Sequence, residues 1–393
     1  MVAGILKQGN AARALAALFV CLFFAACDIP QVTTTPGTGT RTSSDPVNVA
    51  LLVPSGSGVA ELDTIAASLE RAARLAAADL NGVSVNLSVY STQRNSAVAV
   101  AAATQAVSEG ADIILGPLDG DSAAAVGLAL RQANTNVLAF SNNTAVAGGN
   151  VYLLGQTFED SARRVAQYAS GQGKSRILIV HANTVAGEAG RAAVTRAVVQ
   201  NGLAIAGTSS YDNSLTGISS ASASIRSTAR SGGADAIFLT SNTAGALPVL
   251  ADILPEAGLG PDTIQYLGLS RWDLDPRLFT LAGVQGGWFA MPDVARQQAF
   301  SARYSAANGS APHPLAFTAY DGVAIIGALW AQGGANPLGG AAITRSQGFQ
   351  GATGIVRLRP NGTNERGLSI GSIQGGQLVT LDAAPQSFGS AGL

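Results

Sequence analysis

The sequence predicts an α/β fold with two doubly wound parallel-sheet lobes joined by a hinge. Residues 47–53 read VNVALLV, an apolar run broken only by Asn48, which is typical of a strand buried on both faces. A turn of small residues, PSGSG, and then apolar residues at helical spacing over 60–80 follow it, as at the start of a βαβ unit. Strand and helix patterns continue to alternate along the chain, which favours parallel sheets.

The alternation runs through the chain in two rounds, separated near Gly155. The first round predicts strands at 47–53, 83–90, 136–140 and 151–154, a strand followed by a turn at 112–118, and helices at 60–80, 97–109 and 122–132. The second predicts strands at 176–181, 203–208, 234–240, 263–269 and 286–291, with helices at 159–170, 187–200, 217–230 and 243–254. Helices at 294–307 and 315–330 follow, and then a closing pair of strands at 353–358 and 368–381 joined by an Arg-Pro-Asn-Gly turn.

These patterns predict a chain that returns to both lobes. We expect lobe 1 to comprise residues 47–156 plus 291–345, and lobe 2 residues 157–290 plus 346–393. Two lobes with several crossings leave a cleft that can close on a ligand by hinge motion.

Composition limits the classes of function. The 393 residues are 47% hydrophobic and 12% charged, so the chain can bury the cores of two domains. The formal net charge is −1 and the arginines are scattered, which argues against nucleic acid as a partner.

The first residues resemble an export signal. Lys7 and Arg13 precede an apolar segment, 14–26, too short to span a membrane. Small residues before Cys27 resemble the bacterial lipobox, in which Cys27 is lipidated; ordinary cleavage beside an incidental cysteine is the alternative. We expect a signal peptide (1–26), a flexible tether rich in Thr, Ser, Pro and Gly (27–46), and a lipid-anchored protein on the periplasmic side of the cell envelope, in the inner or the outer membrane.

The sequence contains few of the residue patterns that are typical of catalytic sites. The two histidines, His181 and His313, are far apart in sequence, and there is no Gly-x-Ser-x-Gly, His-Glu-x-x-His or cysteine nucleophile pattern. Asp119 and Asp121 are the one close pair of carboxylates near a strand end, which is too few for a metal site. We expect no catalytic residues, no metal, no cofactor and no enzyme activity.

Four segments resemble the type I periplasmic binding fold, in its leucine-binding-protein-like class. They read VALLVPSGSG (49–58), ILGPLDGDS (114–122), VLAFSNNT (137–144) and TAYDGVAI (318–325). The resemblance covers roughly residues 47–380. It implies a solute-binding protein of an ABC transporter for amino acids or a related small ligand.

Within this class, other segments resemble the penicillin-binding-protein activator lipoproteins. They read VYLLGQTFEDSARRVAQYA (151–169), YLGLSRWD (266–273), VQGGWFAMPD (284–293) and AFTAYDG (316–322). This resemblance implies an envelope lipoprotein that regulates peptidoglycan synthesis by activating a penicillin-binding protein as its partner. We take this as the first functional hypothesis and the transporter receptor as the alternative.

Polar residues at the predicted strand ends are the candidate ligand contacts. In the first lobe they are Ser55, Gly56, Ser57, Ser122, Ser141, Asn142, Asn143 and Thr144; in the second they are His181, Asn242, Thr243, Ser270 and Arg271. Residues 55–57 offer N–H groups and hydroxyls to an anion or simply close a turn, and Ser122 either contacts ligand or caps the next helix. Residues 141–144 can likewise cap a helix, form a turn or bind the ligand.

The charges at these strand ends argue against a free amino acid. Asp119 and Asp121 repel a ligand carboxylate at the loop that holds it in amino-acid-binding relatives. Those relatives clasp the ligand ammonium with an aromatic side chain and an acid, which this chain lacks at the matching places. Arg271 suits a carboxylate or phosphate, or else forms a structural ion pair with Asp273. We expect Asp321 to be satisfied inside the first lobe.

Overall fold

The computed structural model describes residues 45–388 of the chain. The predicted signal peptide, the predicted lipidation site Cys27 and nearly all of the tether lie outside the described residues. Among the described helices, none is both long and apolar enough to cross a membrane.

A five-stranded parallel sheet forms the centre of the first lobe, in the order β2-β1-β3-β4-β5. The apolar run 47–53 forms β1, which pairs with β2 on one side and β3 on the other, and all its residues except Asn48 are buried. A strand between two others and under helices on both faces needs apolar side chains in both directions, which explains the continuous run. The strands are β1 (Val47–Val53), β2 (Val85–Ser91), β3 (Ile113–Leu115), β4 (Val137–Ala139) and β5 (Val151–Leu153).

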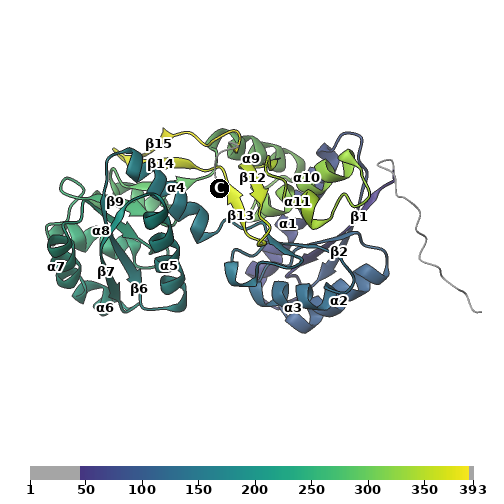
Figure 1. Cartoon of the computed structure of the whole chain (residues 1–393), viewed down its shortest axis with the longest axis horizontal. Helices are drawn as coiled ribbons and strands as arrows, with labels where there is room; N and C mark the ends of the chain where they lie inside the picture. Colours follow the sequence, from purple (N-terminus) through teal and green to yellow (C-terminus); the bar gives the residue numbers. More distant parts are fainter. Residues whose placement is uncertain (1–44, 389–393) are drawn as a thin grey trace, which may run out of the picture. The chain divides into compact units, whose positions relative to one another are not determined.

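Helices cover both faces of this sheet. Val49 and Leu51 belong to a core shared with α1 and α10, whereas Ala50 and Leu52 pack with α2 and α3, because successive side chains of a strand point to opposite faces. Figure 1 shows α1 and α10 together, although they are far apart in sequence. The helical segments are α1 (Ala60–Asp79), α2 (Ser96–Ser108), α3 (Gly120–Leu130), η1 (Thr144–Val146), α9 (Val294–Asn308), α10 (Ala316–Gln332) and α11 (Gly340–Ile343).

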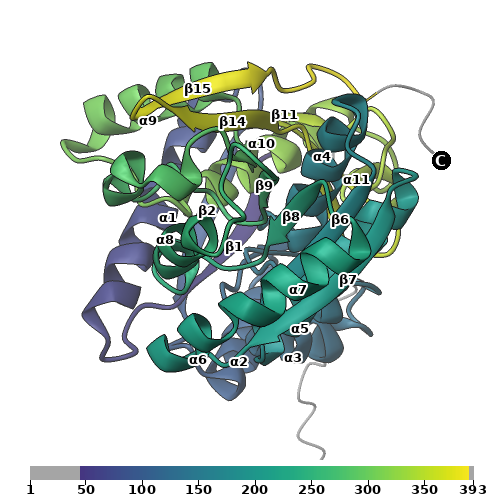
Figure 2. The ribbon, with the colours of Figure 1, turned by 90° about the vertical axis from the view of Figure 1, so that its left-hand side faces the viewer.

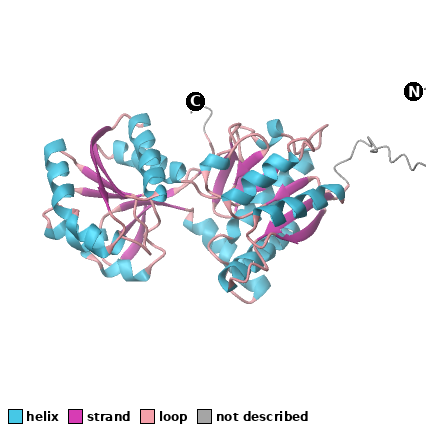
Figure 3. Ribbon diagram, turned by 90° about the horizontal axis from the view of Figure 1, so that it is seen from below, coloured by secondary structure: helices cyan, strands magenta, loops and turns pink. Residues whose placement is uncertain are grey.

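The second lobe repeats this topology. Its parallel strands run β7-β6-β8-β9-β10, which is the first sheet's order again, with α4 and α5 packed on one face and α6, α7 and α8 on the other. Figure 3 shows the strands of each lobe between layers of helix. The strands are β6 (Arg176–Ala182), β7 (Ala204–Tyr211), β8 (Ala236–Leu239), β9 (Gln265–Gly268) and β10 (Trp288–Met291). The helical segments are α4 (Phe158–Gly171), α5 (Val185–Gln200), α6 (Leu215–Ser220), α7 (Ser222–Gly232), α8 (Leu247–Glu256), η2 (Pro276–Thr280) and η3 (Ala282–Val284).

Two antiparallel strands extend the second sheet. β14 (Ser369–Gln374) pairs with β10, and β15 (Gln377–Asp382) pairs with β14; Figure 2 shows this hairpin in yellow. Gly375 and Gly376, both at positive φ, make its two-residue turn, as a tight hairpin requires. The predicted single strand over 368–381 is therefore wrong: the segment folds back on itself at the glycine pair.

A small third sheet lies on the first lobe. Its order is β11-β12-β13, with β11 (Phe349–Gly351), β12 (Gly354–Leu358) and β13 (Asn364–Arg366) all antiparallel. The Arg-Pro-Asn-Gly turn joins β12 to β13, not to a strand in 368–381 as predicted. Phe349, Val356 and Leu358 pack in the core of α1 and α10, so these strands lie with lobe 1, whereas we assigned residues from 346 onward to lobe 2.

The described chain passes between the two sheets at three places. These are the connections β5–α4, β10–α9 and β13–β14, at residues 154–157, 292–293 and 367–368. The α/β fold class with two lobes is thus confirmed. The side chains next to these connections line the pockets described below.

Candidate functional site

A cavity of about 440 Å³ takes side chains from both lobes, and we call it the cleft pocket. Apolar side chains and small polar groups make up most of its wall, and Arg271 is the charged residue among the described residues that line it. The lining residues are Leu118, Phe140, Ser141, Asn142, Gly155, Gln156, Thr157, Phe158, Ser161, Leu269, Ser270, Arg271, Leu274, Pro292, Pro314, Leu315, Phe317 and Thr318. A mostly apolar cavity with a few convergent polar groups is typical of a small-molecule site.

Four predicted site residues meet in this pocket: Ser141 and Asn142 after β4, and Ser270 and Arg271 after β9. The two pairs come from the carboxyl ends of parallel strands in different lobes, where ligands bind in open α/β sheets. The hydroxyl of Ser270 donates to the carbonyl of Ser241 at 2.9 Å, which leaves its oxygen lone pairs to accept from a ligand.

Arg271 is held in place by Asp273. Its Nε donates to Asp273 Oδ1 at 3.0 Å and its Nη2 to Oδ2, so the ion pair that we considered as an alternative is present. Because Arg271 also lines the cleft pocket, the structural contact and a ligand contact are compatible. A guanidinium carries five N–H donors. Because Asp273 occupies Nε–H and one Nη2 hydrogen, both Nη1 hydrogens and the second Nη2 hydrogen remain for a ligand carboxylate.

Residues 55–57 do not line the cleft pocket. Gly56 adopts φ +72° and its N–H donates to Asp63 Oδ1 at 2.8 Å, while Ser57 Oγ accepts from the N–H of Val59. These contacts are typical of a turn followed by the start of a helix. They agree with the alternative that residues 55–57 simply close a turn.

Ser122 and His181 are buried away from the cleft pocket. The N–H of Ser122 donates to Asp119 Oδ1 at 2.9 Å, so Asp119 is the N-cap of α3, and Ser122 lies inside the helix rather than capping it. Nδ1 of His181 lies within hydrogen-bond distance of the backbone carbonyl oxygen of Ala182, at 3.1 Å.

The remaining predicted residues also lie outside the cleft pocket. Asn242 and Thr243 belong to the turn before α8. The backbone carbonyl oxygen of Asn242 accepts hydrogen bonds from the N–H groups of Gly245 and Leu247. Asn143 caps η1 through the N–H of Ala145.

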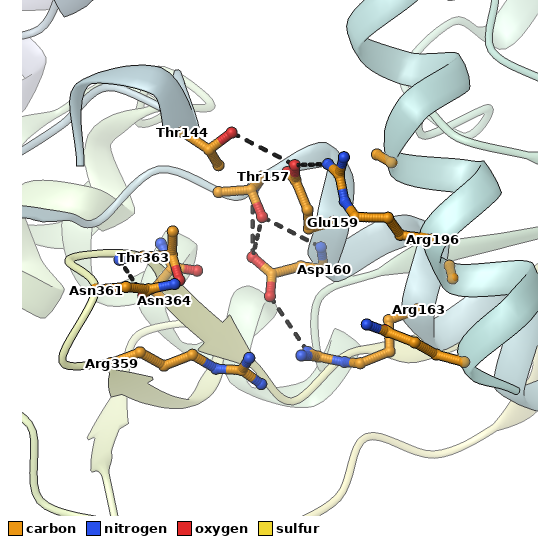
Figure 4. Close-up of a pocket in the computed structure, with 13 residues that line it drawn as sticks. Thr144, Thr157, Glu159, Asp160, Arg163, Arg196, Arg359, Asn361, Thr363 and Asn364 are labelled. Atoms are coloured by element: carbon orange, nitrogen blue, oxygen red, sulfur yellow. Dashed lines mark hydrogen bonds and ion pairs between the residues drawn. The ribbon is translucent and has the colours of Figure 1, made fainter. Parts of the chain in front are cut away.

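Thr144 lines a second cavity, of about 450 Å³, which we call the arginine pocket (Figure 4). It lies among η1, the start of α4, the second half of α5 and the β12–β13 hairpin. Its lining residues are Thr144, Thr157, Glu159, Asp160, Arg163, Ala193, Arg196, Ala197, Gln200, Arg359, Asn361, Thr363 and Asn364. Almost all of them are polar or charged, in contrast to the cleft pocket.

Ion pairs set the electrostatics of the arginine pocket. Arg196 pairs with Glu159 at 2.6 Å and Arg163 pairs with Asp160 at 3.2 Å. Burial raises the pKa of Asp160, against the opposing effects of Arg163 and of the hydrogen bonds from Thr157. Glu365 pairs with Arg163 and Arg359 of the pocket wall; burial would raise its pKa, but the neighbouring arginines hold the pKa below its ordinary value.

A model of the periplasmic binding protein family matches residues 46–377 of the chain. The chain belongs to this family. The resemblance to leucine-binding-protein-like receptors is thereby confirmed, whereas the finer resemblance to penicillin-binding-protein activators is not shown. No curated protein matches the chain.

Solved structures of similar periplasmic binding proteins share the fold. One is a putative branched-chain amino acid ABC transporter protein from Rhodospirillum rubrum, with a TM-score of 0.72 and 17% identity over 86% of this chain and 100% of that chain. A branched-chain amino acid ABC transporter ligand-binding protein from Burkholderia xenovorans has a TM-score of 0.68 and 19% identity over 86% of this chain and 96% of that one. A solute-binding protein from R. palustris, solved with benzoate, has a TM-score of 0.57 and 18% identity over 88% and 98% of the two chains.

Strand-end reasoning missed several residues lining the cleft pocket of this periplasmic binding protein. Gln156–Phe158 and Ser161 come from the start of α4, and Leu315, Phe317 and Thr318 from the start of α10. The α4 residues had a readable signal, because Thr157-x-x-Asp160 is a capping box: Thr157 Oγ1 accepts from Asp160 N, and Asp160 Oδ2 accepts from Thr157 N. The α10 residues are mostly apolar and carry no such signal.

Proposed function

We propose that this protein is a solute-binding receptor of an ABC transporter, and that its cleft pocket captures a small molecule with an apolar body and a carboxylate. The observation that carries the proposal is the lining of the cleft pocket: apolar walls, a guanidinium, and no carboxylate among its described residues. The comparisons support the receptor role, because two of the similar structures are described as the ligand-binding or solute-binding protein of an ABC transporter.

The charge of the pocket selects the ligand class. An α-amino acid brings an ammonium, and a buried ammonium without an opposing carboxylate loses its hydration uncompensated. Arg271 offers the ligand's carboxylate charge-assisted hydrogen bonds, and Ser141, Asn142 and Ser270 offer neutral ones. We therefore expect carboxylates without a charged amine, of the kind illustrated by the benzoate in the R. palustris protein, to bind better than the corresponding amino acids.

Binding rather than catalysis is what this lining supports. The family consists of solute-binding proteins, and the role we propose needs no reacting group. The family is periplasmic, and the proposal includes lipid anchoring at Cys27, which would keep the receptor near its transporter.

A thermal-shift screen tests the proposal, with aliphatic and aromatic carboxylates each paired with the matching α-amino acid. A ligand at one hundred times its dissociation constant stabilises the folded protein by about 2.7 kcal/mol. Arg271→Gln should reduce this stabilisation by about half or more, because a tenfold loss of affinity leaves the ligand at only about ten times the new dissociation constant. Arg277→Gln is the matched control, because Arg277 pairs with Asp275 on the same segment and is 84% exposed.

Activation of a penicillin-binding protein is the second candidate, carried by the resemblance at residues 266–293. In the structure, Tyr266, Trp272 and Phe289 of these segments are buried in the second lobe's core, so much of the matching sequence serves packing. Leu274, in the same stretch, is half exposed and is a large apolar side chain that a partner could contact. Recovery of a peptidoglycan synthase in a pull-down, lost on Leu274→Glu, would favour this candidate.

A further inference from the structure

We propose that the arginine pocket is a second ligand site, separate from the cleft pocket, and that it takes a small hydroxylated carboxylate. Such a ligand has an oxyanion for the guanidinium groups and hydroxyls for the neutral polar groups around them. The proposal goes beyond the transport receptor and does not depend on it.

The first support is the charge on the pocket wall. Among the described residues, three arginines line the pocket (Arg163, Arg196 and Arg359) against two carboxylates, Glu159 and Asp160. Both carboxylates are already engaged, Glu159 by Arg196 and Asp160 by Arg163 and by the N–H and hydroxyl of Thr157. Figure 4 shows Arg163 and Arg359 extending toward each other, one from α4 and the other from the β12–β13 hairpin.

The second support is the number of donors that these arginines leave free. Among residues 45–388, Arg196 is bound through Nη2 alone, to Glu159 at 2.6 Å, and Arg359 through Nη2 alone, to Glu365 at 2.6 Å. Nε, Nη1 and the second Nη2 hydrogen of each guanidinium group remain as donors, and that Nη2 hydrogen forms a two-donor fork for a carboxylate with whichever of Nε or Nη1 lies on its side. Their side chains are about half exposed, so a ligand can reach them from solvent.

The third support is a buried acceptor without a donor. Asn364 is 4% exposed, and its Nδ2 donates to the carbonyls of Leu153 and Gly155 at 2.9 and 2.8 Å, which fixes the orientation of the amide. Its Oδ1 has no hydrogen-bond partner among the described residues, although Asn364 lines the pocket. A buried oxygen of this kind is stabilised by a donor, and a ligand hydroxyl supplies one.

The fourth support is the rigid frame of the pocket. The turn that carries Arg359 is closed by the N–H of Arg359 to Thr363 O and the N–H of Gly362 to Arg359 O, each at 2.8 Å. The N–H of Leu153 in β5 donates to Gly362 O, also at 2.8 Å, which fastens the turn to the first sheet. A site that is ordered before binding loses less entropy when its ligand arrives.

The two pockets can be tested apart, because Thr157 is the one described residue that lines both and Arg271 lines the cleft pocket alone. The experiment is isothermal titration of the purified full chain with glucuronate, gluconate and citrate, and with glucose as the uncharged counterpart. We expect saturable binding of at least one of the three acids and none of glucose.

Variants on one helix decide whether the binding is in the arginine pocket. Arg196→Gln should weaken it about tenfold or more, since a charge-assisted contact is removed. Arg191→Gln is the control, because Arg191 lies on the same helix α5 and pairs with Glu188 outside the pocket. Arg271→Gln should also leave the affinity unchanged.

A fourth variant should change the affinity in the opposite direction. Glu159→Gln removes the negative charge that competes for Arg196, so it should strengthen binding of the acids severalfold. The proposal is overturned if none of the three acids binds, if glucose binds equally well, or if Arg196→Gln and Arg191→Gln have the same effect.

Discussion

Asp321 and Arg366 form a buried ion pair between α10 and β13, with Oδ2 and Nη1 2.8 Å apart. The second oxygen of Asp321 accepts from the N–H of Ala352 at 2.6 Å, so the carboxylate is satisfied inside the first lobe, as the sequence led us to expect. Arg366 also donates through Nη2 to the carbonyl of Leu154 and lies over the ring of Phe317, 4.9 Å from its centroid. The pair thus fastens α10, which lines the cleft pocket, to the β5–α4 connection at Leu154 and to the strand end before the β13–β14 connection.

Removing one member of this pair should destabilise the protein strongly. Arg366→Met leaves the Asp321 carboxylate buried without its cation, and burial already raises its pKa. We expect a loss of about 3–5 kcal/mol in the free energy of unfolding, measured by urea titration.

Two further variants separate charge from packing. The double variant Asp321→Asn with Arg366→Met should recover part of the loss, because no buried charge then remains. Arg74→Gln, which breaks an exposed helical pair with Glu70, should change stability by less than about 0.5 kcal/mol. A loss in Arg366→Met no greater than in Arg74→Gln would contradict this role of the pair.

The packing of Trp272 limits what can stand at residue 287. Trp272 is fully buried, and a Cβ on Gly287 would overlap its ring. Gly287→Ala should therefore cost about 1–3 kcal/mol of stability through overpacking, as read from denaturant unfolding. Gly171→Ala is the matched control, since no heavy atom would lie within 4 Å of the added carbon; equal effects at the two glycines would refute the packing argument.

The cap of α4 should matter more than that of α5. Thr157 Oγ1 accepts from Asp160 N at 3.1 Å and also donates to the buried Asp160 carboxylate at 2.8 Å, whereas Thr184 Oγ1 only accepts from the N–H of Gly187. Thr184→Ala should cost about 1 kcal/mol, and Thr157→Ala more, because it also takes a donor from a buried carboxylate. Chemical denaturation of both variants would show this order; the reverse order would count against it.

Glu365 should make stability depend on acid pH. Burial alone would raise its pKa, but Arg163, Arg359 and Arg357 bring it below its ordinary 4.5. The unfolded chain then binds a proton more readily, so the stabilisation by Glu365 is present above about pH 4.5 and is lost as the pH falls through the folded pKa. The stability difference between the native protein and Glu365→Gln should accordingly shrink from about pH 6 to about pH 3. A difference that stays constant or grows on acidification would be inconsistent with the lowered pKa.

Regular patterns made most of the fold predictable. The run 47–53 is typical of a buried strand and forms β1, and the strand–helix alternation after it indicated both parallel sheets. The segment 346–381 was harder because its pairing depends on tertiary contacts: β12 packs on α10, while β14 joins β10. The Gly375-Gly376 turn was the local signal that could have revealed the second hairpin.

The site was predictable only in part. Strand-end polarity pointed to Ser141, Asn142, Ser270 and Arg271, which do line the cleft pocket. The same criterion also selected Ser122 and His181, which are buried, because polarity at a strand end does not reveal which way a side chain points. Of the residues that line the arginine pocket, strand-end polarity selected Thr144 alone, since the arginines of the pocket come from α4, α5 and a hairpin that only the fold brings together.

The most direct measurement of the central claim is the affinity of the purified protein for small apolar carboxylates, each compared with its α-amino counterpart by isothermal titration calorimetry. The account predicts that the carboxylates bind, that the amino acids bind more weakly, and that Arg271→Gln weakens carboxylate binding about tenfold or more while Arg277→Gln does not. Preferential binding of the amino acids, or carboxylate binding that is unaffected by Arg271→Gln, would contradict it.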